Sequence, residues 1–153
     1  LTGHLVLSSL HANDAAGAVS RLVDMGIEPF LVASAVNLVL AQRLLRVTCQ
    51  RCKMPHHPSD LLLHQLGLPI DHDYEQGLGC DYCARTGYLG RSGAYEALEV
   101  TPPIQSLIMQ KSSPAQIRDA AIAAGMTTLR EDALAKVLAG VTTPDEVARA
   151  TLE

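Results

Sequence analysis

Four cysteines are the residues of this sequence whose type and spacing point most directly to chemistry. Cys49 pairs with Cys52 and Cys80 with Cys83, and twenty-seven residues separate the two pairs. Two such pairs can bring four thiolates to one tetrahedral zinc ion, and with four protein ligands no coordination position stays open for water. The pattern therefore predicts a bound zinc ion with a structural role rather than a catalytic one.

The same four thiols could also stay unmetallated and buried, form two disulfides, or act as a redox pair. Disulfides are disfavoured because no signal-peptide pattern opens the chain, and a thioredoxin-like pair would need βαβ surroundings that the sequence lacks. Four histidines between the cysteine pairs could replace a cysteine ligand, although we expect them to be exposed: His56, His57, His64 and His72.

Two histidines near the start of the chain form the second candidate site. His4 begins and His11 follows the apolar run of residues 4–10, which predicts a short buried β-strand. A histidine at a strand end can donate a hydrogen bond to a phosphate oxygen, whereas one inside a strand usually fills space. The spacing alone leaves both roles open.

The helices and strands that must position these residues can be predicted from caps and apolar spacing. Asn13 is predicted to cap a helix that ends at Gly26. Pro29 suits the first turn of a second helix, which is predicted to continue to about Ala41. Residues 42–47 either finish this helix or form a strand.

The rest of the chain alternates short strands and helices. Residues 59–66 predict a short helix, and residues 87–96 predict short strands separated by glycine turns. From Thr101 onward about four short helices are predicted, because capping hydroxyls precede prolines and glycines follow the apolar runs. One of these helices is predicted to carry an apolar face of Leu129, Leu134, Val137 and Leu138. The predicted fold class is therefore α+β.

Composition and charge exclude several classes of protein. Hydrophobic residues make up 48% and charged residues 18%, which is typical of a globular chain. The net charge of −4, without any run of basic residues, argues against binding to nucleic acid or to an anionic membrane surface. The longest apolar stretch, residues 29–41, is too short to span a bilayer. A chain that begins with Leu1 rather than Met is expected to be part of a longer, cytoplasmic protein.

The order of motifs resembles one known family. Residues 1–15 resemble the histidine box of the type II secretion and type IV pilus-assembly ATPases, and the similarity covers essentially the whole chain. Further matching blocks are residues 24–30, 40–44, the two cysteine pairs, 86–96, 125–126 and 129–132. Retraction ATPases of the same superfamily lack the four cysteines, which argues against that branch. Residues 25–30 are more similar to the secretion branch than to the pilus-assembly branch.

The resemblance implies a cytoplasmic, hexameric motor in which ATP hydrolysis drives assembly of a pseudopilus or, alternatively, a type IV pilus. It places His4 and His11 near the terminal phosphate of the nucleotide. The 153 residues contain no glycine-rich loop followed by Lys and Ser or Thr. ATP and Mg²⁺ would therefore bind only to the longer parent protein, and the chain alone is expected to be inactive.

The resemblance also implies three parts and a set of partners. Residues 1–48 would be the C-terminal remnant of a RecA-like ATPase domain, residues 49–98 a tetracysteine zinc module, and residues 99–153 a small helical bundle. Partners would be inner-membrane components of the secretion or pilus machinery, reached through protein contacts without membrane insertion. The rival hypothesis is a non-enzymatic zinc-binding adaptor.

Overall fold

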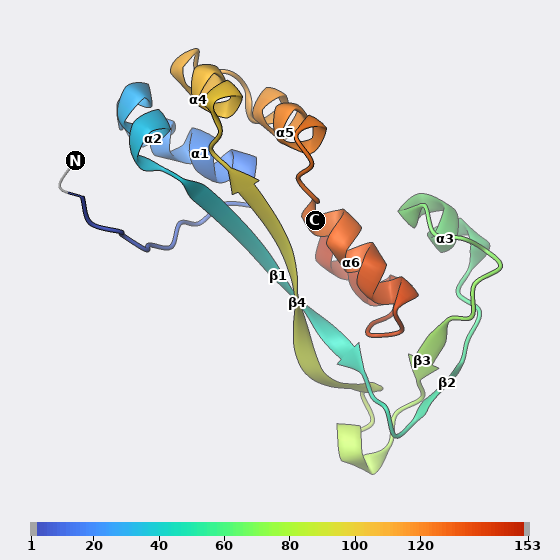
Figure 1. Cartoon of the computed structure of the whole chain (residues 1–153). Helices are drawn as coiled ribbons and strands as arrows, with labels where there is room; N and C mark the ends of the chain where they lie inside the picture. Colours follow the sequence, from blue (N-terminus) through green and yellow to red (C-terminus); the bar gives the residue numbers. More distant parts are fainter. Residues whose placement is uncertain (1–2, 152–153) are drawn as a thin grey trace. The chain divides into compact units, whose positions relative to one another are not determined.

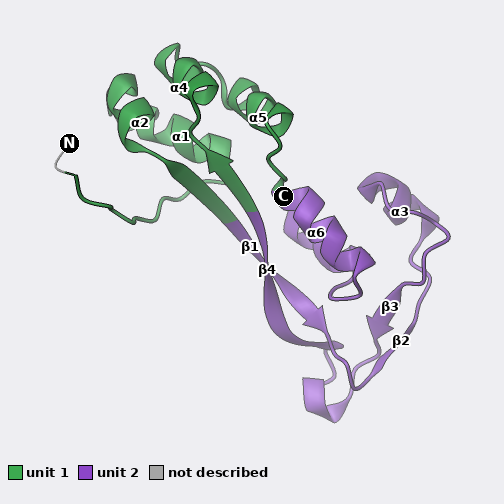
Figure 2. Cartoon of the chain, viewed as in Figure 1, with its two compact units in different colours: residues 1–41, 96–128 green, residues 42–95, 129–153 purple. Residues whose placement is uncertain are grey.

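The computed structural model describes residues 3–151 and divides them into two compact units (Figures 1 and 2). One unit joins residues 1–41 with 96–128, and the other joins residues 42–95 with 129–153. Leu1 and Thr2, which open the resemblance to the histidine box, and Leu152 and Glu153 lie outside the described residues. Each unit therefore combines two segments that are far apart in the sequence, and the three-part division above stays a prediction.

The first unit contains four helices around an aliphatic core. The helices are α1 (Ala15–Asp24), α2 (Pro29–Ala35), α4 (Pro102–Met109) and α5 (Pro114–Ala123). The core residues are Ala15, Ala16, Val19, Val32, Ala33, Leu98, Val100, Ile104, Ile108, Ile117 and Ala121. Full burial of one large aliphatic side chain contributes about 1.5–3 kcal/mol, so this core is the main support of the unit.

Local capping chemistry sets where several helices begin. Asp14, and not the predicted Asn13, caps α1, because its Oδ1 accepts a hydrogen bond from the Gly17 N–H at 2.7 Å. Ser113 and Gln116 form the predicted capping box at the start of α5. Ser59 caps α3 (Asp60–Leu66), which confirms the predicted short helix.

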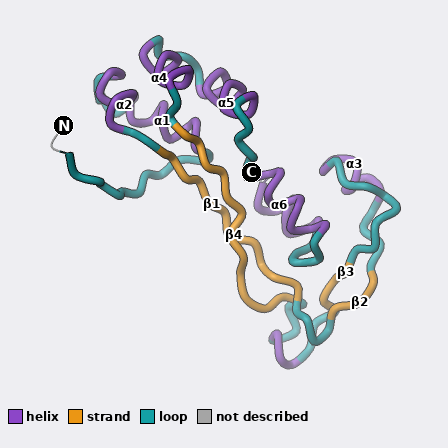
Figure 3. Tube along the Cα trace, viewed as in Figure 1, coloured by secondary structure: helices purple, strands orange, loops and turns teal. Residues whose placement is uncertain are grey.

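The strands of residues 3–151 form two pairs (Figure 3). The long strands β1 (Leu38–Thr48) and β4 (Tyr88–Glu99) pair with each other, and β2 (Lys53–Pro55) pairs antiparallel with β3 (Glu75–Gly77). Residues 42–47 are therefore strand, and of the segment 87–96 all residues from Tyr88 onward belong to one long strand rather than to several short ones.

The predicted end of the second helix near Ala41 is wrong, because α2 ends at Ala35 and β1 begins at Leu38. Val39 and Ala41 pack against the core of the first unit, while Leu38 and Leu40 are exposed. This alternation has the period of two that a strand requires. Pairing with β4 therefore outweighs the helical signal of the apolar run.

The predicted strand at residues 4–10 is also wrong. The segment is irregular, and Leu5, Val6 and Leu7 are 81%, 77% and 88% exposed. A strand needs a neighbouring strand to pair its backbone N–H and C=O groups, and within residues 3–151 neither sheet includes this segment. An apolar pattern without such a neighbour does not produce a strand.

The second unit contains α3, the short 3₁₀ helix η1 (Asp81–Cys83), α6 (Leu129–Leu138) and α7 (Pro144–Thr151). All four predicted C-terminal helices form, but α4 and α5 belong to the first unit while α6 and α7 belong to the second. A single C-terminal bundle is therefore not confirmed. On α6 the buried residues are Leu129, Ala133 and Val137, whereas Leu138 of the predicted face is 42% exposed.

Candidate metal centre

The four cysteine sulfurs of the second unit converge on one point. All four Sγ atoms lie within 4.8 Å of one another. Cys83 Sγ is 3.9 Å from Cys52 Sγ and 3.8 Å from Cys80 Sγ. A tetrahedral zinc ion with Zn–S bonds of about 2.3 Å places its sulfur ligands about 3.8 Å apart. The four predicted ligands therefore lie together, at a spacing that fits one metal ion.

Backbone hydrogen bonds hold the two cysteine pairs against each other. Cys49 directly follows β1, and its N–H donates to the Gly87 carbonyl at 2.9 Å, just before β4 begins. The Cys52 carbonyl accepts a hydrogen bond from the Leu78 N–H at 3.0 Å. Each cysteine of the first pair is thus bonded to a segment that flanks the second pair, so strand ends rather than flexible loops position the sulfurs.

Glycines permit this close approach. A Cβ atom added at Gly77 would lie 2.0 Å from the Gly87 carbonyl oxygen, and one added at Gly87 would lie 2.3 Å from the Gly77 oxygen. Gly79 has a φ of +92°, and a Cβ there would lie 2.5 Å from the Arg85 oxygen. The sequence analysis missed these residues, although Gly77 and Gly79 lie three residues and one residue before Cys80 and could have been noticed there.

The protein environment lowers the pKa of one cysteine thiol and raises the pKa of another. Hydrogen bonding by the Cys80 backbone, helped by the Gly87 backbone, lowers the pKa of Cys83 to about 6. Burial raises the pKa of the Cys52 thiol to about 12. A bound cation favours the thiolate form of every ligand, so metal binding and proton release are linked at this site.

The histidines between the cysteine pairs do not join the cluster. Within the described residues, the four cysteines are the only group of three or more potential metal ligands. His57 lies 3.3 Å from a carboxylate oxygen of Asp60, and the His72 ring packs edge-on against Tyr74 at 4.8 Å. Replacement of a cysteine ligand by histidine therefore finds no support in the geometry.

His4 and His11 are exposed residues of the irregular N-terminal segment. Neither belongs to the cysteine cluster, which contains no histidine. Their role near a nucleotide phosphate thus stays a prediction about the longer protein.

A buried carboxylate that the sequence analysis missed joins the end of β1 to α7. The Glu146 side chain is 0% exposed. Its oxygens accept hydrogen bonds from the Arg46 N–H at 3.0 Å, the Arg46 Nε at 2.8 Å and the Arg149 Nε at 2.9 Å. Burial alone would raise the pKa of Glu146, but the hydrogen bonds from Arg149 and Arg46 outweigh it and lower the pKa to about 2.

This lowered pKa predicts how stability depends on pH. The ionised carboxylate stabilises the fold fully above the ordinary pKa of 4.5, and the contribution is lost as pH falls toward about 2. Between pH 5 and pH 2, the unfolding free energy of the wild type should fall by about 3 kcal/mol more than that of Glu146→Gln. Urea unfolding at a series of pH values, with the same saturating zinc concentration for both proteins so that the second unit is folded at the start, measures this difference. Parallel pH profiles for the two proteins would contradict the prediction.

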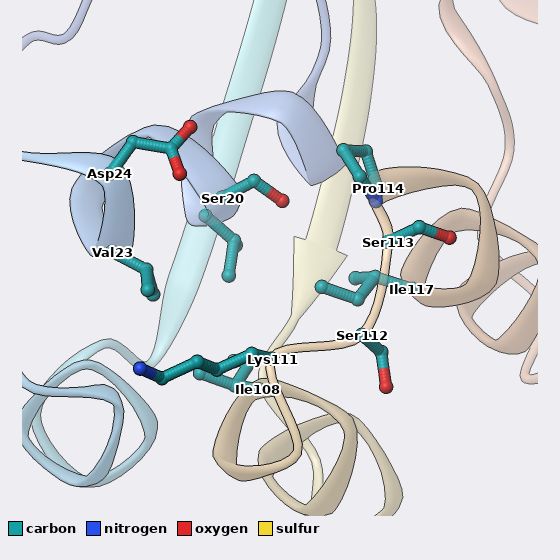
Figure 4. A pocket seen from close by; sticks show the side chains of 10 residues that line it. Ser20, Val23, Asp24, Ile108, Lys111, Ser112, Ser113, Pro114 and Ile117 are labelled. Atoms are coloured by element: carbon teal, nitrogen blue, oxygen red, sulfur yellow. The ribbon is translucent and has the colours of Figure 1, made fainter.

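A separate cavity of about 270 Å³ lies in the first unit, between α1 and the connection from α4 to α5 (Figure 4). Its polar side chains come from five residues: Ser20, Asp24, Lys111, Ser112 and Ser113. The Ser20 hydroxyl is buried and has no hydrogen-bond partner. None of the predicted site residues lines this cavity.

Comparison with known proteins finds similar proteins that match this chain over nearly its whole length. The family model described as "Type II/IV secretion system protein" matches residues 1–149. The type IV pilus assembly ATPase PilB of Thermus thermophilus is 44% identical over 157 residues, which cover 100% of this chain and 18% of that protein. The type II secretion system protein E of Pseudomonas aeruginosa is 46% identical, with coverage of 100% and 31%, and that of Dickeya dadantii is 45% identical, with coverage of 100% and 30%.

The chain thus spans less than a third of the length of these relatives. Among the helices of residues 3–151, none has the length and apolar character needed to cross a membrane.

Proposed function

The chain belongs to the type II/IV secretion system protein family, and we infer from this that it is part of an ATPase that powers type II protein secretion by assembling a pseudopilus. The similarity to type II secretion system proteins E over the full length of the chain carries this proposal. ATP and Mg²⁺ would be held by the longer protein, because the glycine-rich loop and its Lys are absent from the 153 residues. The chain alone would then not hydrolyse ATP.

Type IV pilus assembly is the second candidate. PilB of Thermus thermophilus is 44% identical to this chain and the secretion protein of Pseudomonas aeruginosa is 46% identical, so overall identity does not separate the two branches. The match of residues 25–30 favours secretion. Either branch implies a hexameric, cytoplasmic parent that meets inner-membrane components through protein contacts, with residues 1–48 as a remnant of its RecA-like domain.

For the cysteine cluster we propose a structural zinc ion bound by Cys49, Cys52, Cys80 and Cys83. The convergence of the four sulfurs at zinc-like distances supports this assignment. The ion would clamp the end of β1 and the start of β2 against the segment that carries the second pair. A pure adaptor role would need a binding face of its own, and the net charge of −4 does not favour a nucleic-acid partner.

Deleting the gene in its source organism separates the two branches. Loss of extracellular enzymes with normal pili would support the secretion proposal, and loss of surface pili with normal secretion would replace it by the pilus-assembly one. If both processes continue unchanged in the deletion strain, the motor proposal is wrong.

In the full-length protein, His11→Ala is expected to lower ATP turnover about 10-fold or more while nucleotide affinity changes little. A donor near the terminal phosphate acts mainly on charge that develops during phosphoryl transfer. Steady-state hydrolysis together with nucleotide titration measures both quantities. His56→Ala, at another exposed histidine, is the matched control. Equal ATP turnover in the two variants would show that His11 takes no part in hydrolysis.

A further inference from the structure

Helix α7 and the turn before it hold the strand that supplies the first cysteine. The Thr48 N–H donates to the Val141 carbonyl at 2.9 Å, and the Thr142 hydroxyl donates to the Arg46 carbonyl at 2.8 Å. Glu146 of α7 accepts from both the backbone and the guanidinium of Arg46. Because Thr48 immediately precedes Cys49, three successive contacts fix the backbone that leads into the cluster.

The strand that follows the second cysteine pair is held by the same turn. Tyr88 is the first residue of β4, and its hydroxyl lies 2.7 Å from the Thr143 hydroxyl. The guanidinium of Arg46 lies over the Tyr88 ring, 4.2 Å from its centre. Gly87, the neighbour of Tyr88, accepts the hydrogen bond from the Cys49 N–H. The contacts of the turn and of Glu146 therefore meet where both long strands lead into the cysteine cluster.

The residues of the turn and of α7 that make these contacts are buried, whereas the Arg46 side chain is 44% exposed. Thr142 and Thr143 are 3% and 2% exposed, and Glu146 is fully buried. A buried carboxylate that loses its partners keeps its desolvation cost, so such a group tolerates only a narrow range of positions. Ion pairs of this kind are better suited to fixing one arrangement of the backbone than to adding net stability.

We propose that Glu146 and Arg46 are positioning residues of the metal centre, and that helix α7 belongs to the metal-binding module although it lies about a hundred residues from the first cysteine. This inference rests on the proposed metal site. Metal affinity and the order of α7 are then coupled, and the coupling acts in both directions: loosening α7 weakens metal binding, and removing the metal loosens α7.

Zinc titration of the full, metal-free chain in competition with a chromophoric chelator tests the first direction. Glu146→Gln should weaken zinc affinity about 10- to 100-fold, the usual range for residues that orient metal ligands from outside. Asp145→Asn removes the same charge from the exposed neighbouring residue of α7 and should leave the affinity unchanged. Tyr88→Phe, which deletes only the hydroxyl bonded to Thr143, should give a smaller loss and serves as the test if Glu146→Gln does not fold.

Hydrogen exchange of the wild type tests the opposite direction. Removing zinc should accelerate exchange in residues 141–151 and leave α4 of the first unit unchanged. The coupling would be overturned by normal zinc affinity in both Glu146→Gln and Tyr88→Phe, or by equal exchange rates in α7 with and without zinc. Neither result would contradict the zinc site itself. A wild-type chain that binds no zinc would instead overturn the metal proposal itself and this inference with it.

Discussion

Replacing Cys49 with serine is expected to reduce bound zinc from about one ion per chain to almost none and to unfold much of the second unit. Cys49 is fully buried, and its sulfur is one of four that converge on a single point. Structural zinc sites contribute on the order of 10–16 kcal/mol in isolated zinc-finger peptides, so the binding free energy of the metal is largely folding free energy. Metal analysis after purification without chelator gives the stoichiometry, and hydrogen exchange gives the order of the unit.

The first unit provides the internal control for this substitution. Its aliphatic core contains no cysteine, so exchange rates of α1 and α4 should match those of the wild type. The zinc assignment would be wrong if wild-type protein carried no metal while all four thiols reacted freely with a thiol reagent.

A second large loss of stability and of zinc affinity is expected for Gly77→Ala. The new methyl group would lie 2.0 Å from the Gly87 carbonyl oxygen, a distance that forces the two segments apart. Since the added group meets backbone rather than a flexible side chain, we expect a loss of about 3 kcal/mol or more and a matching loss of zinc affinity. Chemical denaturation with and without zinc measures both effects.

Gly90→Ala in the same unit is the matched control. Gly90 has a φ of +80° with no atom within 4 Å of the added group. The substitution should therefore lower the unfolding free energy by about 1–2 kcal/mol, through backbone strain alone. Zinc affinity should be retained there. Equal zinc affinity in both variants would show that the close approach of residues 77 and 87 does not matter for the metal.

Features encoded within a few residues could be predicted from the sequence. The cysteine cluster follows from two short spacings, and the caps at Ser59 and Ser113 depend on residues three positions away. The predicted cap of α1 differs from the observed one by one residue. Asn13 and Asp14 are both good capping residues, and only the folded geometry selects Asp14.

Features that depend on distant partners could not be predicted. The strand character of residues 38–41 depends on β4, which lies about fifty residues further along the chain. Residues 4–10 have the pattern of a strand but no neighbouring strand among residues 3–151. Glu146 stands three residues after Thr143, a local spacing that gives no sign of its partner, yet its carboxylate is bound by Arg46, a hundred residues away.

The division of the chain into two interleaved units also orders the events of synthesis. Residues 1–41 leave the ribosome before the segment that completes their unit, residues 96–128, which follows only after the whole cysteine region has emerged. At about 5–20 residues per second, the early segment waits several seconds for its partner. The four thiols are likewise made before α6 and α7, so the nascent cysteine cluster meets cellular metal and oxidants before the helices that complete its unit exist.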